Sequence, residues 1–307
     1  MAITSSVPEH FPQLYQSEWK LEVQQMASRL QSLVPVYPVL GESRRFNKLG
    51  QINSSDMTGR FQDSAPDDVS TEMRHLYVNF KTAENFVSRV DSIRLGEIDS
   101  PHSSIMRSHM AAAGRDRDQA IIDGLGGSVY EGKNGGSEVV FNTTDYSIAK
   151  TYDYAAVAAN VGLTYDKIVN ARTRLGLKNV AGQNVEGGSP LGMVISHTEI
   201  EDLLHDDKFI NRDYRSKLEE AQTGSIVDAF GFTIMAVDES LLPVVANTRA
   251  CYAWAKDCVA FGYAENPQTF VDELPTKRHD TQIRSEWAFG MTRLDDEGVI
   301  QINVHRA

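Results

Sequence analysis

Histidine and carboxylate side chains recur at four-residue spacing in one segment of the sequence. His197, Glu201 and His205 would share one face of a helix, because helical residues four apart are neighbours. Two imidazoles and a carboxylate are a ligand set that zinc accepts. Their order differs from the HExxH arrangement of zinc enzymes, and Asp202 and Asp206 mark the segment as solvent-facing. We therefore predict a solvated helix here and no metal site.

Other residue types with chemical potential also have simpler interpretations. The glycine-rich segment 124–127 follows a helical stretch instead of preceding one, which predicts a helix end and not a phosphate loop. Cys251 and Cys258 lie in an apolar, strand-like stretch and are expected to be buried. His102 and His109 are predicted to contact a partner or solvent. No nucleophile, base and orienting group can be assembled, so we predict a non-enzymatic protein without a cofactor.

Composition and charge exclude several classes of protein. The chain has 307 residues, of which 41% are hydrophobic and 23% charged, as in soluble folded proteins of about two domains. Its net charge is −12 and neither half is positive, which argues against nucleic-acid recognition as the main function. No apolar run approaches the length needed to cross a bilayer, and the first 30 residues contain no secretory signal. Two cysteines suit a reducing compartment.

The N-terminal segment carries apolar residues at alternating spacings of four and three. This pattern predicts an amphipathic helix of about four turns, with Ser17 as its cap and Pro35 as its end. Such a helix packs either on the chain's own core or, as an arm, on a neighbouring subunit. The residues of the stripe are Trp19, Val23, Met26, Leu30 and Leu33.

Residues 41–75 have recurrent glycines, few apolar residues and no helical period. A segment of this length without its own core is usually functional or disordered. Short strand-like pieces occur at 44–49 and 60–62, and a strand with Leu76, Val78 and Phe80 on one face follows at 74–81. The cations alternate with acids, which suits salt bridges to other chains; a plain solvated loop is the alternative. These cations include Arg44, Arg45, Lys48, Arg60 and Arg74.

The rest of the chain reads as one long helix followed by an α+β region. The helix is predicted over 100–127, with Arg115–Asp118 as a charged face and an apolar stripe. A glycine-rich hinge at 132–136 follows. The apolar stripe consists of Met106, Met110, Ala113, Ala120 and Leu125. Beyond the hinge we expect a helix after Thr164, strands at 193–195, 232–237 and 250–263, and a helix opened by a capping box at Ser196–Glu199. The chain is expected to close with a hairpin, in which 287–291 pairs with 300–304 around a turn at 295–298.

In the order of its expected elements along the sequence, the chain resembles the major capsid protein of tailed bacteriophages with the Hong Kong 97-type fold. The segment from Asp99-Ser100-Pro101 to Gly126-Gly127 is similar to the spine helix of that family. The resemblance covers nearly the whole chain. Further similar motifs are Val194-Ile195-Ser196 with Leu203-Leu204, Gly224-Ser225-Ile226 with Phe230-Gly231-Phe232-Thr233-Ile234, and Gly290-Met291-Thr292-Arg293-Leu294 with Gly298-Val299-Ile300.

The resemblance implies a fold class and a division into domains. The fold class is α+β, with an N-terminal arm, an extended β-hairpin loop, a peripheral domain with a long spine helix, and an axial domain. By this resemblance, residues 1–40 form the arm and 41–82 the extended loop. Residues 83–135 and 268–307 form the peripheral domain, and 136–267 the axial domain.

The resemblance also implies a function and partners. The protein would self-assemble into hexamers and pentamers of an icosahedral head, in the virion, after assembly in the host cytoplasm. Packaged DNA would lie near it without specific binding. The arm helix begins by Trp19, which leaves no room for a removable scaffolding segment, so a separate scaffolding protein is expected beside a portal and a decoration protein. The expected intersubunit contacts are Trp19, Val23, Met26, Leu30, Leu33, Arg44, Arg45, Lys48 and Arg60.

Two alternatives remain open at this point. Encapsulin shells share this fold and enclose cargo enzymes instead of a genome, so the contents of an isolated particle would separate the two. A soluble α+β enzyme of the cytoplasm is the other alternative, and a small defined oligomer with a saturable ligand would favour it.

Overall fold

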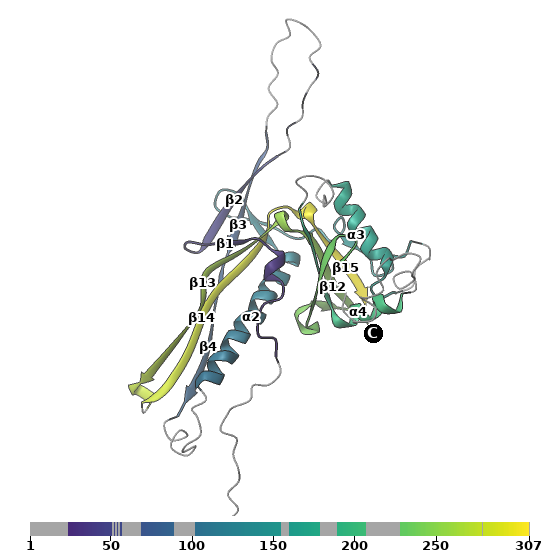
Figure 1. Cartoon of the computed structure of the whole chain (residues 1–307). Helices are drawn as coiled ribbons and strands as arrows, with labels where there is room; N and C mark the ends of the chain where they lie inside the picture. The colour runs from purple at the N-terminus through teal and green to yellow at the C-terminus, as the bar shows by residue number, and fades with distance from the viewer. Residues whose placement is uncertain are drawn as a thin grey trace, which may run out of the picture.

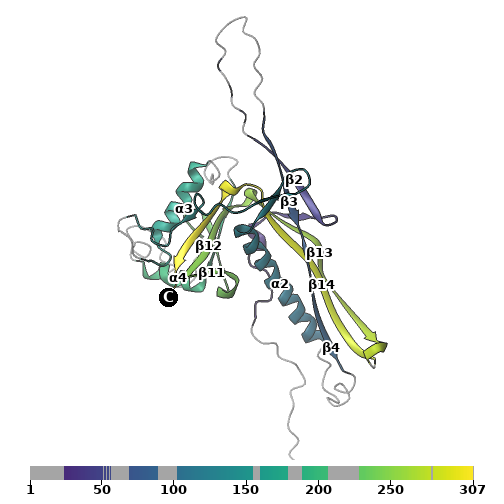
Figure 2. The same cartoon turned by 180° about the vertical axis from the view of Figure 1, so that it is seen from behind.

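The computed structural model describes residues 24–50, 52, 54, 56, 69–88, 102–154, 160–178, 189–206, 228–277 and 279–306. These residues form an elongated half, in which one long helix lies alongside long strands, and a compact half beside one end of the elongated half (Figures 1 and 2). Mixed α+β architecture is confirmed. Among the described residues, no helix is long and apolar enough to cross a membrane.

The elongated half is built on a four-stranded sheet in the order β1-β13-β14-β4. The long helix α2, His102–Gly126, lies along one face of this sheet and confirms the predicted single helix (Figure 1). Its end fits closely against β14, because a side chain at Gly124 would meet Met291 at 2.6 Å. The strands are β1 (Val36–Pro38), β4 (Asn79–Val87), β13 (Val259–Leu274) and β14 (Asp280–Arg293).

The buried face of α2 differs in part from the predicted stripe. Ala113 and Leu125 are buried as expected, but Met110 is 46% exposed. The predicted charged face at Arg115–Asp118 is wrong, because Asp118 is fully buried. The carboxylate lies four residues before buried Ile122, and so occupies the apolar side of the helix.

The compact half is a seven-stranded sheet in the order β7-β15-β12-β8-β10-β9, with β11 paired to β12. The central strand β8 is buried along its whole length, as expected of a strand with neighbours on both sides and helices over it. Helices α3 (Tyr165–Leu177) and α4 (His197–His205) pack beside the sheet (Figure 1). The strands are β7 (Ser147–Ile148), β8 (Leu191–Ser196), β9 (Asp228–Ala229), β10 (Phe232–Val237), β11 (Val244–Val245), β12 (Thr248–Ala255) and β15 (Val299–His305).

Two strand predictions in the compact half are confirmed, whereas the single strand predicted at 250–263 is divided. The strand expected at 232–237 is β10, and the strand at 193–195 lies inside β8. At the start of α4 the Glu199 carboxylate accepts the backbone N–H of Ser196 at 2.8 Å, which is one half of the expected capping box. The stretch 250–263 is divided between β12 and β13 by a short 3₁₀ turn, η3 (Lys256–Cys258).

A third sheet, in the order β2-β3-β5-β6, stands where the two halves meet. Gly132 and Gly135 have positive φ angles of 89° and 65°, so the predicted glycine hinge is the turn of the β5–β6 hairpin. The strand expected at 74–81 divides between β3 and β4, and Phe80 is 70% exposed because β4 belongs to another sheet. The strands are β2 (Ser43–Leu49), β3 (Thr71–Tyr77), β5 (Val129–Glu131) and β6 (Ser137–Val139).

The predicted arm helix is wrong over the residues that the structure describes. Residues 24–30 have no helical turn, and 31–33 form a single 3₁₀ turn, η1 (Gln31–Leu33). The backbone N–H groups of Arg29 and Leu30 donate to the carboxylate of Asp118 and not to carbonyls one helical turn earlier. The start of the predicted helix, residues 17–23, lies outside the described residues.

The predicted closing hairpin is also wrong. β14 pairs with β13 and β4, whereas β15 pairs with β12 and β7. The turn at 295–298 therefore carries the chain from the elongated half to the compact half, through η5 (Asp296–Gly298). The pairing groups β15 with strands of the proposed axial domain, although the domain boundaries themselves stay a prediction.

Candidate assembly surfaces

The face of α4 that carries His197, Glu201 and His205 is exposed, whereas Glu199, Ile200 and Leu203 of the same helix are buried. Glu201 and His205 are exposed, and their nearest side-chain atoms lie 3.9 Å apart. In the part of the chain that the structure describes, no group of three or more His, Cys, Asp and Glu side chains could hold a metal ion. Both cysteines are free, and burial raises the pKa of the Cys258 thiol to about 12, which makes it a poor nucleophile.

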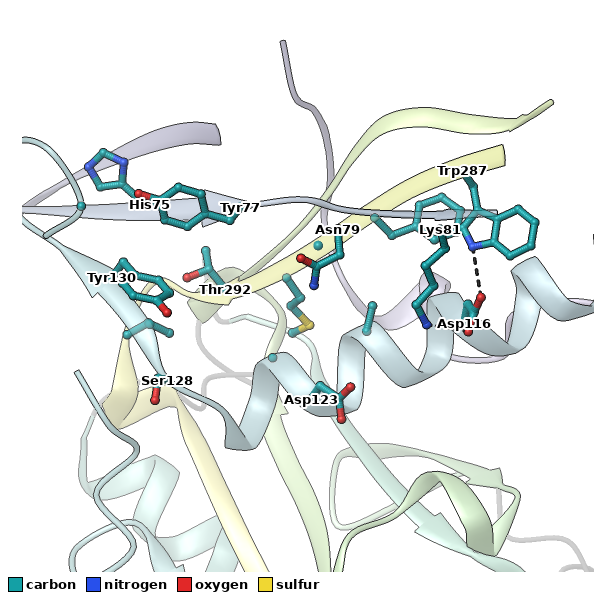
Figure 3. A pocket seen from close by; sticks show the side chains of 17 residues that line it. His75, Tyr77, Asn79, Lys81, Asp116, Asp123, Ser128, Tyr130, Trp287 and Thr292 are labelled. Atoms are coloured by element: carbon teal, nitrogen blue, oxygen red, sulfur yellow. Dashed lines mark hydrogen bonds and ion pairs between the residues drawn. The ribbon is translucent and has the colours of Figure 1, made fainter. Parts of the chain in front are cut away.

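A pocket of about 520 Å³ lies between α2, the β3–β5 pair and β14 (Figure 3). His75, Tyr77 and Tyr130 stand at one end, with Tyr77 and Tyr130 in edge-to-face contact at 5.3 Å. At the other end Lys81 pairs with Asp116 at 2.7 Å. The indole N–H of Trp287 also donates to Asp116, at 3.1 Å. These side chains bind one another, so we interpret the pocket as a structural contact region between the helix and the sheets.

His109 is buried, although the sequence predicted it at a surface. Its Nδ1 lies 3.0 Å from the Ser285 hydroxyl and its Nε2 lies 2.7 Å from Asn85 Oδ1. A serine, histidine and asparagine in this order resemble a catalytic relay. Ser285 is fully buried, however, and no substrate can reach its hydroxyl. The three side chains instead fasten α2 to β14 and β4, and burial lowers the pKa of His109.

The arm stripe divides between surface and core. Met26 is 50% exposed, Leu30 is fully buried and Leu33 packs against the main core. Trp19 and Val23 lie outside the described residues. Leu30 therefore anchors the arm within its own subunit, as the own-core alternative predicted. A polar substitution at Leu30 would test the stability of the fold and not assembly.

Charged residues of α2 hold the root of the arm, residues 24–31. The Asp118 carboxylate accepts the Ser28 hydroxyl at 2.6 Å and the backbone N–H of Leu30 at 3.1 Å. Arg115 donates to the side chain of Gln24 at 2.7 Å, and Arg117 donates to that of Gln31 at 2.5 Å. Sequence reasoning missed this function, although the position of Asp118 on the apolar side of the helix was a signal that could have found it.

The cations of the loop base have different surroundings. Arg44 donates to the Pro38 carbonyl at 2.8 Å and stacks over Tyr37. Lys48 pairs with Asp295 at 3.1 Å; burial lowers its pKa, but the hydrogen bond and charge of Asp295 outweigh this and raise it. Lys48 therefore has an anionic partner within its own chain, and Arg44 contacts a carbonyl and an aromatic ring there. Arg45 is exposed.

Comparison with known proteins now places the chain. A family model described as "Phage capsid protein" matches residues 7–305. The chain belongs to this phage capsid protein family. No curated protein sequence matches this capsid protein. Its fold is nevertheless shared, over nearly the full length of both chains, with solved phage structures.

Three of these structures illustrate the similarity of fold. A protein of Mycobacterium phage Che8 is 15% identical, with 96% of this chain and 97% of that chain covered and a TM-score of 0.71. The capsid asymmetric unit of cyanophage Pam1 is 14% identical, with coverage of 100% and 98% and a TM-score of 0.73. The capsid of Ralstonia phage GP4 is 9% identical, with coverage of 100% and 98% and a TM-score of 0.71. The predicted α+β capsid fold is thereby confirmed.

In this capsid protein, the described residues among the expected intersubunit contacts have different surroundings. Met26 and Arg45 are exposed, on the arm root and on β2 respectively. Leu30, Arg44 and Lys48 are engaged inside the subunit. Arg60 lies outside the described residues. Sequence reasoning did not predict the contacts of Arg115, Arg117 and Asp118 with the arm root. It also did not predict the ion pair of Lys48 with Asp295 at the loop base.

Proposed function

We propose that this protein is the major capsid protein of a tailed bacteriophage, which self-assembles as hexamers and pentamers into the icosahedral head that encloses the DNA genome. The observation that carries the proposal is the match of a phage capsid family model to residues 7–305. The long helix beside a long sheet, with a compact half at one end, supports it. We infer a structural role without catalysis.

The parts of the chain would divide this work. Residues 1–40 would act as the arm and 41–82 as the extended loop, with the peripheral domain formed by 83–135 and 268–307. Residues 136–267 would form the axial domain. The sheet order supports one refinement: β15 pairs with β12, so residues 299–305 belong with the axial strands.

Contacts between subunits would involve the arm and the loop. Exposed apolar side chains support this, since large apolar groups left in water favour burial against a partner. Met26 on the arm root and Leu49 at the end of β2 are 50% and 64% exposed. We propose that Trp19, Val23 and Met26 contact a neighbour. In the loop, we assign the corresponding contacts to Arg45 and Arg60, together with the outer faces of Arg44 and Lys48.

Further partners follow from the same proposal. A separate scaffolding protein would guide assembly in the host cytoplasm, a portal would occupy one vertex, and a decoration protein would bind the outer surface. Packaged DNA would lie close without specific recognition, and the net charge of −12 supports weak contact with phosphates.

The contents of the purified particle test the proposal. Particles recovered from infected or induced cells should contain double-stranded DNA of one defined length. Particles filled with a single protein instead of DNA would support the encapsulin alternative. A small oligomer that saturates with a ligand would support the soluble enzyme.

Limited trypsin digestion tests the proposed role of the loop. The free chain should be cut first within 44–74, and assembled shells should resist cleavage there. Arg45 is the exposed cation of β2, so Arg45→Gln should slow early cleavage in the free chain. Equal cleavage of the loop in both states would mean that it does not contact a neighbour.

A further inference from the structure

Two passages of the chain between the elongated and compact halves lie side by side. The first runs from β12 through η3 into β13, and the second runs from β14 through η5 into β15. The backbone N–H groups of Leu294 and Asp295 both donate to the Cys258 carbonyl, at 2.8 and 3.1 Å. The second passage is therefore hydrogen-bonded directly to the first, and a change in the angle between the halves would strain these two bonds.

Three consecutive acidic residues of the second passage pair with cations from different elements. Asp295 pairs with Lys48 of β2 at 3.1 Å. Glu297 pairs with Lys178, next to the end of α3, at 2.7 Å. Asp296, between them, binds a cation with each carboxylate oxygen. One turn thus connects the loop base, the elongated sheet and the compact half.

The two partners of Asp296 are both buried arginines. Arg293 of β14 donates from Nε to Oδ1 at 2.8 Å, and Arg74 of β3 donates from Nη2 to Oδ2 at 2.9 Å. Burial raises the pKa of Asp296, but the hydrogen bond and charge of Arg293, with the charge of Arg74, outweigh it, so its pKa lies below the usual value. Asp296 therefore stays ionised near neutral pH.

Arg293 also holds the end of the long helix. Its Nη1 donates to the carbonyls of Gly124, Leu125 and Gly127 at 3.2, 3.0 and 2.5 Å. These carbonyls lie at the C-terminal end of α2, where a cation is favoured by the helix dipole. The guanidinium stacks over Phe141, 4.8 Å from the ring centroid. One side chain thereby fixes the helix end to the passage between the halves.

Arg74 fixes the loop base to the same point. Its Nη2 also reaches Glu131 of β5 at 2.7 Å. The next residue, His75, places Nε2 at 2.8 Å from the Gly132 carbonyl, and Leu76 is fully buried. Strand β3 is therefore held at consecutive residues, and the direction of the β2–β3 pair follows from these contacts.

We propose that Lys48, Arg74, Arg293, Asp295 and Asp296 form a junction lock, which sets the direction of the loop base β2–β3 relative to the compact half. Asp296 is its central positioning residue. A buried charge left without its partner is strongly unfavourable, so the lock holds only one arrangement of the two halves. Exposed pairs contribute little, and Lys178–Glu297 is secondary. The proposal concerns the single subunit and holds whether or not shells form.

Hydrogen exchange of the full-length protein tests the junction lock. The variant Asp296→Asn keeps the shape of the side chain and removes its charge. We expect amides of residues 43–49 and 71–77 to exchange about tenfold faster, while those of the buried strand β8 stay within about twofold of wild type. The matched control is Glu286→Gln on the same strand as Arg293, which removes an exposed pair with Arg284 at 3.3 Å and should change neither region.

Two results would overturn the proposal. Unchanged exchange of β2 and β3 in Asp296→Asn would show that Asp296 does not hold the loop base, and an equal increase in β8 would show a general loss of stability instead of a local lock. Should Asp296→Asn fail to fold, Arg74→Lys is the second test. It keeps the charge but replaces the guanidinium, whose Nη2 reaches both Asp296 and Glu131, with an ammonium on a shorter side chain. Wild-type exchange at β3 in this variant would contradict the lock.

Discussion

The Asp118 carboxylate accepts the backbone N–H of Leu30 at 3.1 Å, although the two residues are 88 positions apart in the sequence. The same carboxylate accepts the N–H of Arg29 at 3.0 Å and the Ser28 hydroxyl at 2.6 Å. It thus binds the turn where the N-terminal arm enters the core. Together with Arg115 and Arg117, this buried carboxylate fixes the arm root to the long helix.

Replacing Asp118 should release the arm root. Asp118→Asn removes the charge and turns one acceptor oxygen into a donor that faces other donors. We expect the free energy of unfolding to fall by about 2–4 kcal/mol and trypsin to cut faster after exposed Arg29. Urea unfolding and timed digestion measure the two effects. Asp123→Asn is the matched control, since Asp123 is exposed on the same helix. An equal fall in the free energy of unfolding in both variants would contradict the role of Asp118 in holding the arm root.

Lys167 gives a second prediction, in the compact half. Its buried ammonium donates to the carbonyls of Lys150, Val161, Gly162 and Asn303, at 2.9 to 3.1 Å. Burial lowers its pKa from 10.5 to about 8, which corresponds to about 3 kcal/mol of cost for the charge. Four carbonyls without a donor would cost about 1–3 kcal/mol each, so the lost hydrogen bonds should outweigh the gain.

We therefore expect Lys167→Met to lower the free energy of unfolding by at least about 2 kcal/mol. The fluorescence of buried Trp254, on strand β12 of the compact half, can report urea unfolding. Lys133→Met, at an exposed turn, should leave the midpoint unchanged. Equal or greater stability of Lys167→Met would mean that the buried charge costs more than its hydrogen bonds contribute.

Protonation of His109 should contribute to the pH dependence of the free energy of unfolding. A neutral ring that donates from Nε2 to Asn85 can accept the Ser285 proton at Nδ1, and burial disfavours the charged ring, which lowers the pKa of His109. Because the folded pKa is below the unfolded value of about 6.5, this stability is complete above pH 6.5 and is lost as pH falls below it.

Unfolding measured at intervals from pH 7.5 to pH 5 checks this term. Wild type should lose stability over this range, and His109→Gln, which cannot gain the proton, should have a flatter profile. The carboxyls of Asp296 and Glu199 also have lowered pKa values, but their loss begins near their unfolded pKa values of about 4. Identical slopes in both proteins would exclude His109 as the source.

Gly290 tests the close approach between β14 and the β3–β4 connection. A side chain at Gly290 would clash with the backbone oxygen of Tyr77, whereas the atoms nearest to one at Gly262 are side-chain ends of Leu76 and Val39. Backbone cannot move as easily as a side-chain end, so Gly290→Ala should destabilise by more than the about 1–3 kcal/mol typical of overpacking. Gly262→Ala should remain within that range. Thermal unfolding of both variants compares them, and the reverse order would contradict the packing described.

Local signals in the sequence predicted elements better than partners. The glycines after Leu125 marked the end of α2, and the short apolar stretch 232–237 marked β10. Alternation also marked β14 and β15 as half-buried strands, yet it specifies which face is buried and not which strand is adjacent. The hairpin prediction failed for this reason. Both strands have apolar faces, but they pack in different sheets.

The surfaces were harder to predict because their contacts join distant positions. The stripe from Trp19 to Leu33 had helical spacing, but the Asp118 carboxylate took the backbone N–H groups that a helix would have used. Similarly, the sequence around Lys48 indicates an unpaired loop cation, whereas in the folded chain Lys48 pairs with Asp295. Charge pattern along a segment indicates that partners are needed, and only the fold identifies them.

Negative-stain electron microscopy of the purified full-length protein, alone and co-expressed with the proposed scaffolding protein, tests the capsid function most directly. We predict closed icosahedral shells of uniform size in at least one of these preparations. Micrographs that show only a small defined oligomer in both, from protein that is folded by circular dichroism, would contradict the assignment of this chain as a capsid subunit.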